Sequence, residues 1–236
     1  MAFINSYLPF ISSTVSFIFA AVVFQRYFER HRPQLLLWGI GMVFYGIGGF
    51  CEGFYGTFGW NDTIYRLWYL FGAILVAAWL GQGTVYLLAK KRWANTLMAL
   101  LAIGSLYAAF KIFTAQLDPS LMTAGELSGH AIITPGVRIL TPFFNLYGTV
   151  TLVGGAIWSA WIFWRKRVLL HRTIGNILIA VGAMSPAFGG AFSRFGLSGA
   201  LYISELLGAI IMFLGFLRAI TPIETENTST AQPASE

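Results

Sequence analysis

Residues 64–93 read IYRLWYLFGAILVAAWLGQGTVYLLAKKRW, a long apolar run that ends in a basic triplet. About 20 apolar residues of α-helix cross a bilayer core roughly 30 Å thick, so the run over 64–88 is long enough to span it. Lys90, Lys91 and Arg92 follow at once, and basic residues concentrate beside the cytoplasmic face of a membrane. This stretch therefore predicts a transmembrane helix that leads into a cytoplasmic loop.

Six further stretches have the same character as this run. The predicted spans are 5–25, 35–55, 64–88, 93–115, 141–164, 173–195 and 199–219. The chain of 236 residues is 57% hydrophobic and only 10% charged, whereas a soluble domain carries roughly 25% charged residues. The sequence thus predicts an all-α integral membrane protein, with residues 1–220 forming seven transmembrane helices in a plasma membrane or bacterial inner membrane.

Basic residues are divided unequally between the two sides of the predicted bundle. Eleven of the fifteen Lys and Arg residues fall on one side, namely Arg26, Arg30, Arg32, Lys90, Lys91, Arg92, Arg165, Lys166, Arg167, Arg172 and Arg218. The other side receives Arg66, Lys111, Arg138 and Arg194. Because basic loops are retained in the cytoplasm, this bias predicts an external N-terminus and a cytoplasmic C-terminus. Basic residues that flank spans do not indicate a nucleic-acid partner.

Segments outside the spans have their own composition. Residues 221–236 are rich in Thr, Glu and Ser and contain no aromatic residue, which predicts a disordered cytoplasmic tail. Residues 115–140 form the long external loop, and any local order there is expected to be a surface cap. Aromatic residues near the span ends are interpreted as interfacial belts: Trp60, Tyr65, Trp68, Trp93, Trp161 and Trp164.

Spans one to three and five to seven share short sequence similarities at a spacing of about 135 residues. Leu70–Ile74 reads LFGAI and Leu206–Ile210 reads LLGAI, while Gly48-Gly49 corresponds to Gly189-Gly190 near the outer end of the second span of each copy. A fourth span between two such copies restores their orientation, so the pattern predicts a 3+1+3 parallel repeat.

This plan resembles the topology of sugar transporters of the SWEET type and, more distantly, that of microbial rhodopsins. The resemblance is one of topology only. Pro33-Gln34 is similar to the proline-glutamine pair of the SWEET-related family, but here it follows a charged loop rather than lying within a span. A rhodopsin would need a lysine in its last span for retinal, and residues 199–217 contain none. No retinal or other cofactor is predicted, and no family membership follows.

Charged side chains within predicted spans are costly and mark candidate sites. Four of them share the outer half of the membrane: Glu52, Arg66, Arg194 and Glu205. Pairing of Glu52 with Arg194, or of Glu205 with Arg66, would lower the cost of burial. Together with Tyr45 and Tyr69 they form either an outward-facing pocket for a small polar or zwitterionic solute or a structural ion-pair layer. The sequence leaves both interpretations open.

Other polar residues extend from this layer toward the cytoplasmic side. Gln82, Asn145, Thr149 and Asn176 are interpreted as a polar path through the bundle. Pro186, with Gly189 and Gly190, interrupts the sixth span and is interpreted as a hinge. The scattered histidines and the single cysteine lack the spacing of metal ligands, so no metal site is predicted.

Two functions fit these features. The first is a membrane protein that binds or transports a small polar solute at the outer-half site. The alternative is a non-transporting membrane subunit or seven-helix sensor that acts through a protein partner on the basic loops, and a homo-oligomer is a further candidate assembly. No phosphate loop, nucleophile elbow or zinc protease signature indicates an enzyme, although Glu52 and Glu205 stay open as an acid and base from distant spans.

Overall fold

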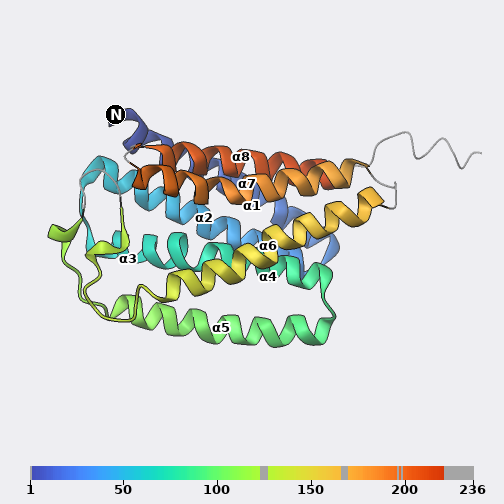
Figure 1. Ribbon diagram of the computed structural model, residues 1–236, viewed down its shortest axis with the longest axis horizontal. Coiled ribbons are helices and arrows are strands. Elements are labelled where there is room, and N and C mark those ends of the chain that lie inside the picture. The colour runs from blue at the N-terminus through green and yellow to red at the C-terminus, as the bar shows by residue number, and fades with distance from the viewer. Residues whose placement is uncertain (1, 123–126, 166–169, 196, 198, 221–236) are drawn as a thin grey trace, which may run out of the picture.

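The computed structural model describes residues 2–122, 127–165, 170–195, 197 and 199–220, and this part of the chain is an all-helical bundle (Figure 1). Seven helical stretches within it are long and apolar enough to cross a membrane, which confirms the seven predicted spans. The helices are α1 (Ala2–Arg30), α2 (Pro33–Phe58), α3 (Asp62–Leu67), η1 (Trp68–Leu75), α4 (Val76–Leu88), α5 (Lys91–Phe113), α6 (Leu140–Arg165), α7 (Leu170–Arg194) and α8 (Ala200–Ile220). The predicted tail at 221–236 lies outside the described residues.

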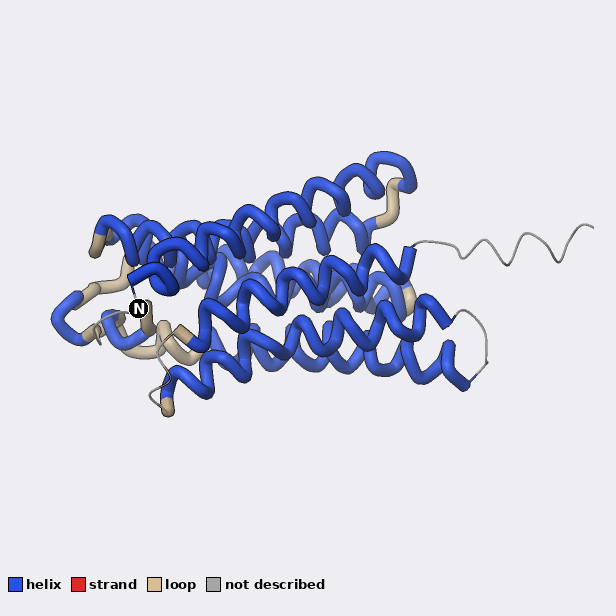
Figure 2. The backbone as a smooth tube through the Cα atoms, turned by 90° about the horizontal axis from the view of Figure 1, so that it is seen from above, coloured by secondary structure: helices blue, strands red, loops and turns tan. Residues whose placement is uncertain are grey.

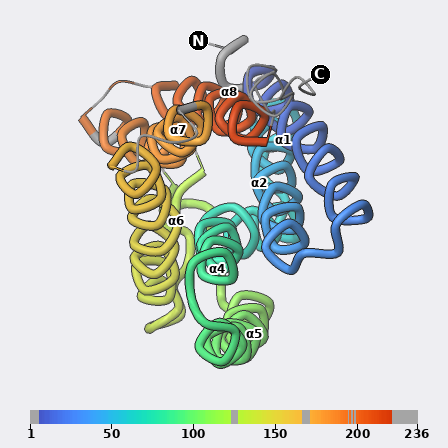
Figure 3. The backbone as a smooth tube through the Cα atoms, turned by 90° about the vertical axis from the view of Figure 1, so that its right-hand side faces the viewer, coloured from blue at the N-terminus to red at the C-terminus, as the bar shows by residue number. Residues whose placement is uncertain are grey.

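Six of the spanning helices form a closed ring. Seen along the long axis (Figure 3), each of α1, α2, α4, α6, α7 and α8 packs against the next, and α8 returns to α1. Helix α5 lies outside this ring and contacts α4 and η1. The lengthwise views in Figures 1 and 2 show the helices lying side by side along the axis. We call the end with residues 114–139 the loop end and the end with Arg30, Lys91 and Arg165 the basic end.

The third span departs from a simple α-helix. It begins at α3, where the Asn61 side chain accepts a hydrogen bond from the amide of Ile64 at 3.0 Å, and it continues into the π-helix η1 before α4. A Cβ atom placed on Gly48 of α2 would lie 3.0 Å from the Cα atom of Gly72 in η1, so α2 and η1 approach closely. Since π-helical turns are rare and recur at functional sites, η1 indicates that this part of the bundle is a candidate functional region.

Residues 114–122 and 127–139 cover the loop end as a cap. Two short turns of 3₁₀-helix, Pro119–Leu121 and Gly129–Ala131, lie between the two residues of an isolated antiparallel bridge, Leu117 and Ile132. The Tyr65 hydroxyl donates a hydrogen bond to the Ser128 carbonyl at 2.9 Å, which ties the cap to α3. Buried residues of the cap join the core cluster below it: Leu127, Ala131, Ile132 and Val137. The cap therefore shields the core residues beneath it, including Tyr65 and Tyr69.

Within the cap, Asp118 begins the first 3₁₀ turn. Its carboxylate accepts hydrogen bonds from the Ser120 amide at 2.9 Å and from the Ser120 hydroxyl at 2.6 Å. These bonds favour the ionised form, so they lower the pKa of Asp118 below its ordinary value. The turn is therefore held by a charged acceptor at neutral pH.

Helices α7 and α8 pack through glycine residues. A Cβ atom on Gly182 would lie 2.7 Å from the Met212 amide nitrogen, and one on Gly215 would lie 2.7 Å from the Gly175 carbonyl oxygen. Small residues permit this approach, which stabilises helix pairs in lipid, where no hydrophobic effect drives helices together. The contact fixes α7 and α8 as one hairpin.

Candidate functional site

Glu52 is more deeply buried than Arg66 and Glu205, the other predicted charged site residues whose side chains the structure describes. It lies near the end of α2 with only 4% of its surface exposed. Its Oε1 atom accepts a hydrogen bond from the Trp68 indole nitrogen of η1 at 2.8 Å. A carboxylate removed from solvent is expensive unless its acceptor sites are engaged, so this position is constrained by both helices.

Tyr45 and Glu205 join α2 to α8 on the same side of the bundle. The Tyr45 hydroxyl donates a hydrogen bond to the Glu205 carbonyl oxygen at 2.9 Å. Tyr45 precedes Glu52 by seven residues, which is two helical turns, or about 10 Å along α2, so both side chains leave the helix on one face. The structure therefore brings Glu52, Tyr45 and Glu205 into one region at the junction of α2 with η1 and α8.

An aromatic cluster lies beside Glu52 under the cap. Trp68 lies at ring-centroid distances of 5.6 Å from Tyr65 and 5.7 Å from Tyr69. The predicted pocket residue Tyr69 is buried in this cluster, and its hydroxyl oxygen accepts a hydrogen bond from the Thr141 hydroxyl at 2.9 Å. Tyr69 also packs against Gly129 of the cap. The Tyr69 side chain therefore packs between the cap and the interior of the bundle.

The interpretation of Tyr65 and Trp68 as interfacial belt residues is wrong. Both are buried, with exposed fractions of 1% and 8%. Trp93 and Trp164, by contrast, are exposed as the belt interpretation requires. Hydropathy places all of these aromatic residues near span ends. Only the folded structure shows which of them are buried. Sequence reasoning therefore missed Trp68 as the direct partner of Glu52.

Arg66 contacts backbone carbonyl groups at the end of α5. Its guanidinium donates hydrogen bonds to the carbonyl oxygens of Ile112 and Ala115, the latter at 2.9 Å. The expected pairing of Arg66 with Glu205 is not formed in the described residues. The last carbonyls of a helix lack partners within that helix and attract cations, and α5 ends close to Arg66.

Arg194 is the last residue of α7, and its side chain lies outside the described residues. The suggested pairing of Glu52 with Arg194 therefore stays a prediction. Glu205 is half-buried on α8 and keeps its place in the candidate site through the contact of its carbonyl oxygen with Tyr45.

The residues of the predicted polar path are mostly used to join helices. Gln82 is fully buried, donates to the Ala94 carbonyl oxygen at 2.8 Å and accepts from the Tyr147 hydroxyl, so it links α4 with α5 and α6. Asn145 donates to the Ala73 carbonyl oxygen at 3.1 Å and links α6 with η1. Asn176 is half-buried on α7.

Thr149 is exposed on α6 and does not belong to an interior path. The buried stripe of α6 includes Gly148, Leu152 and Ala156, and Thr149 is one residue removed from it. One residue corresponds to a rotation of about 100° around an α-helix, since a turn takes 3.6 residues. Its spacing from Asn145 predicted a shared face, but the actual packing face of α6 excludes it.

The predicted hinge lies in a continuous helix. Helix α7 runs from Leu170 to Arg194 through Pro186 without a break. The Ser185 hydroxyl donates to the Ser204 carbonyl oxygen of α8 at 2.7 Å, and a Cβ atom on Gly189 would lie 2.8 Å from the Ala200 carbonyl oxygen. Gly190 has more space around it, because a Cβ atom placed there would lie 3.8 Å from the nearest atom. Bending at Pro186 stays a prediction.

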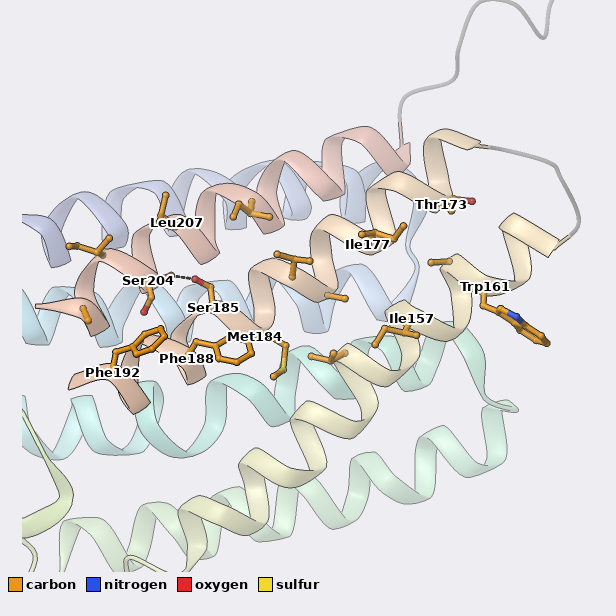
Figure 4. Close-up of a pocket in the computed structure, with 18 of the residues that line it drawn as sticks. Ile157, Trp161, Thr173, Ile177, Met184, Ser185, Phe188, Phe192, Ser204 and Leu207 are labelled. Atoms are coloured by element: carbon orange, nitrogen blue, oxygen red, sulfur yellow. Dashed lines mark hydrogen bonds between the residues drawn. The ribbon is translucent and has the colours of Figure 1, made fainter. Parts of the chain in front are cut away.

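A separate groove lies along α6, α7 and α8 (Figure 4). It encloses about 1010 Å³ and is lined almost entirely by apolar side chains. Figure 4 shows Phe188 and Phe192 at one end and Trp161 and Thr173 at the other. Among the predicted site residues that the structure describes, Gly189 of the predicted hinge lines this groove, whereas Glu52, Tyr45 and Glu205 do not. Sequence reasoning missed this groove, because the apolar residues that line it have the same character as any others in a transmembrane helix.

No protein-family model, curated protein or solved structure matches the chain. Within the described residues, no group of three or more His, Cys, Asp or Glu side chains is placed to hold a metal ion. Function is therefore inferred from the site around Glu52 and from the groove on α7.

Proposed function

We propose that this protein binds a small polar solute in the outer half of the membrane, at the site formed by Glu52, Tyr45 and Glu205. The observation that carries the proposal is the buried carboxylate of Glu52, engaged by Trp68 of a π-helical segment. Ionisable groups within spans are retained mainly where they serve a ligand, an ion or a proton. A π-helical segment beside such a group supports the same conclusion.

The chemistry of the site favours a ligand with an amino group. Glu52 of α2 and Glu205 of α8 supply two carboxylates from different helices, and the Tyr45 hydroxyl donates to the backbone carbonyl oxygen of Glu205. A cationic amine gains charge-assisted hydrogen bonds from carboxylates, and these are stronger than neutral ones.

The proposed orientation places the loop end outside the cell and the basic end in the cytoplasm. Helix α1 begins at the loop end, and the helix ends at Arg30, Lys91 and Arg165 lie together at the basic end (Figure 1). This grouping supports the orientation because positively charged loops are retained on the cytoplasmic side. Ligand would then enter from the outside, past the cap.

The proposed 3+1+3 repeat is supported by the order of helices in the ring. The first helix of each copy packs against the last helix of the other, since α1 contacts α8 and α6 contacts α4. Within each copy a glycine of the second helix meets the third helix, with Gly48 against Gly72 and Gly189 against α8. Helix α5, the linker between the copies, lies outside the ring.

Binding coupled to a partner protein fits the interior better than transport does. Gln82 and Asn145 use their polar groups on neighbouring helices, so the side chains predicted to line a path stabilise the bundle instead. Ligand binding at the site would shift η1. A partner protein bound at the basic end would respond to that shift. Solute transport is the second candidate, and the hinge prediction at Pro186 is the feature that favours it.

A thermal-shift screen of the purified protein against small amines and zwitterions tests the proposal. A ligand at 100 times its Kd is expected to stabilise the fold by about 2.7 kcal/mol. Glu52→Gln retains an acceptor for Trp68 while it removes the charge, so it should abolish the shift. Glu29→Gln is the matched control, because Glu29 is exposed and pairs with Arg26 at the basic end. An undiminished ligand shift in Glu52→Gln would overturn the site, and solute uptake by proteoliposomes would favour transport.

A further inference from the structure

The groove on α6, α7 and α8 is a concave apolar surface at the side of the bundle. Its exposed lining residues include Ile177 and Val181 of α7 and Leu207 of α8. The polar groups of its floor are engaged, because the Ser185 hydroxyl donates to the Ser204 carbonyl oxygen and the Ser204 hydroxyl donates to the Leu201 carbonyl oxygen. Most of the groove therefore offers only apolar contact, which suits a hydrocarbon chain.

One end of the groove has different chemistry. Two guanidinium groups lie at the basic end of α6 and α7, with Arg165 at 5.4 Å from the Trp161 ring centroid and Arg172 at 5.9 Å from that of Phe163. Both arginines are exposed, and Trp161 itself lines the groove. Contact with aromatic faces orients these cations without neutralising them. Neither arginine lines the groove itself, but Arg165 contacts Trp161 of the lining, so positive charge lies next to this end of the groove.

Thr173 adds a polar atom at the same end. It lines the groove beside Trp161 in Figure 4, and its side chain is buried to 5% exposure. Its hydroxyl forms no hydrogen bond within the part of the chain that the structure describes. An unsatisfied buried hydroxyl costs free energy, so rotation of the Thr173 side chain toward an ester or phosphate oxygen in the groove would be favourable.

We propose that the groove binds one anionic glycerophospholipid, with acyl chains along α7 and the phosphate group beside Arg165 and Arg172. Apolar lining at one end and two cations at the other match the two parts of such a lipid. Basic pockets between transmembrane helices bind anionic head groups in this manner. A transmembrane helix of a partner would match this surface only if it carried an acidic residue near the two arginines.

Native mass spectrometry of the delipidated protein tests this site with phosphatidylglycerol and phosphatidylcholine that carry the same acyl chains. Phosphatidylglycerol is expected to bind about 30-fold more tightly, the usual effect of two basic residues near an anionic group. Arg165→Ala with Arg172→Ala should abolish this preference, whereas Arg92→Ala, an exposed arginine of α5 at the same end, should leave it unchanged. Thr173→Val should weaken binding by a smaller factor.

Filling the groove separates this lipid from the surrounding bilayer lipids. Val181→Trp places a ring on the lining and should lower the affinity for both lipids, while Val150→Trp on an exposed position of α6 outside the lining should not. Equal affinity of the wild-type protein for the two lipids would overturn the proposal, as would an unchanged preference in the double arginine variant. A stable dimer that buries Val181 would also overturn it and assign the groove to a second copy of the chain.

Discussion

Buried polar side chains join α2, η1 and α4 on one side of the bundle, in addition to the contact between Gly48 and Gly72, whereas α7 and α8 on the other side are joined mainly by close backbone contact, together with the hydrogen bond from Ser185 to Ser204. On the first side, Trp38 of α2 donates to the Leu80 carbonyl oxygen of α4 at 3.1 Å, and Glu52 accepts from Trp68. On the second, Gly182 and Gly208 bring two backbones together. Lipid does not drive helices together as water does, so each side needs its own source of specific attraction.

This difference in helix packing distinguishes the proposed solute site around Glu52 from the proposed lipid groove on α7. Polar links between helices require buried donors and acceptors, and the same groups can exchange partners with a polar solute. Backbone contact between glycines leaves side chains on the outer faces of α7 and α8 free to form an apolar groove. Solute chemistry is therefore expected on the α2 side, and lipid binding on the α7 side.

The largest effect on stability is expected from a substitution that disturbs the backbone contact between α7 and α8. Gly182→Val would place side-chain atoms against the backbone of α8 at Met212, where a Cβ atom already approaches to 2.7 Å. We expect a loss of about 3 kcal/mol of stability, since a rigid backbone cannot yield as a side chain can. Thermal unfolding in detergent measures this loss.

Gly154 is the control for Gly182. It lies in α6 with no neighbouring atom within 4 Å of an added Cβ atom, so Gly154→Ala should be neutral or stabilise the helix by up to about 1 kcal/mol. Equal effects at the two glycines would mean that backbone proximity does not hold α7 against α8.

An intermediate effect is expected from removal of a polar link on the other side. Gln82→Leu would leave the Tyr147 hydroxyl and the Ala94 carbonyl group without their partner, at a cost of about 2 kcal/mol. The same unfolding measurement applies. Asn95→Ala removes the acceptor of the Tyr86 hydroxyl at an exposed position and should cost much less. If Gln82→Leu were as mild as Asn95→Ala, the α4 side would not depend on polar links.

The smallest effect is expected at the edge of the polar side. Arg66→Ala removes the donor to the Ile112 and Ala115 carbonyl groups and should destabilise the end of α5 by about 1 kcal/mol. Because the cap follows α5, limited proteolysis within residues 114–122 should become faster while global unfolding changes little. Arg138→Ala, an exposed residue of the same loop, is the control. Unchanged proteolysis would show that Arg66 does not hold the cap.

Much of the architecture could be predicted because span length and hydropathy are local properties. Residues 141–164 and 199–219 were predicted, and the helices are Leu140–Arg165 and Ala200–Ile220. The π-helical segment η1 could not be predicted, since it arises where Gly72 meets Gly48 of a different helix. Helical spacing grouped Asn145 with Thr149, but only the position of neighbouring helices decides which of them faces inward.

Composition alone determined that lipid is the solvent for seven helices, because the chain has too few charged residues and too many long apolar runs for a water-soluble core. Only the tertiary structure decided which partner each polar group takes: Arg66 turns to the carbonyl groups of α5, Glu52 accepts from Trp68, and Gln82 joins three helices. Hydropathy is summed along the chain, whereas a hydrogen bond depends on distance between atoms that the fold alone brings together.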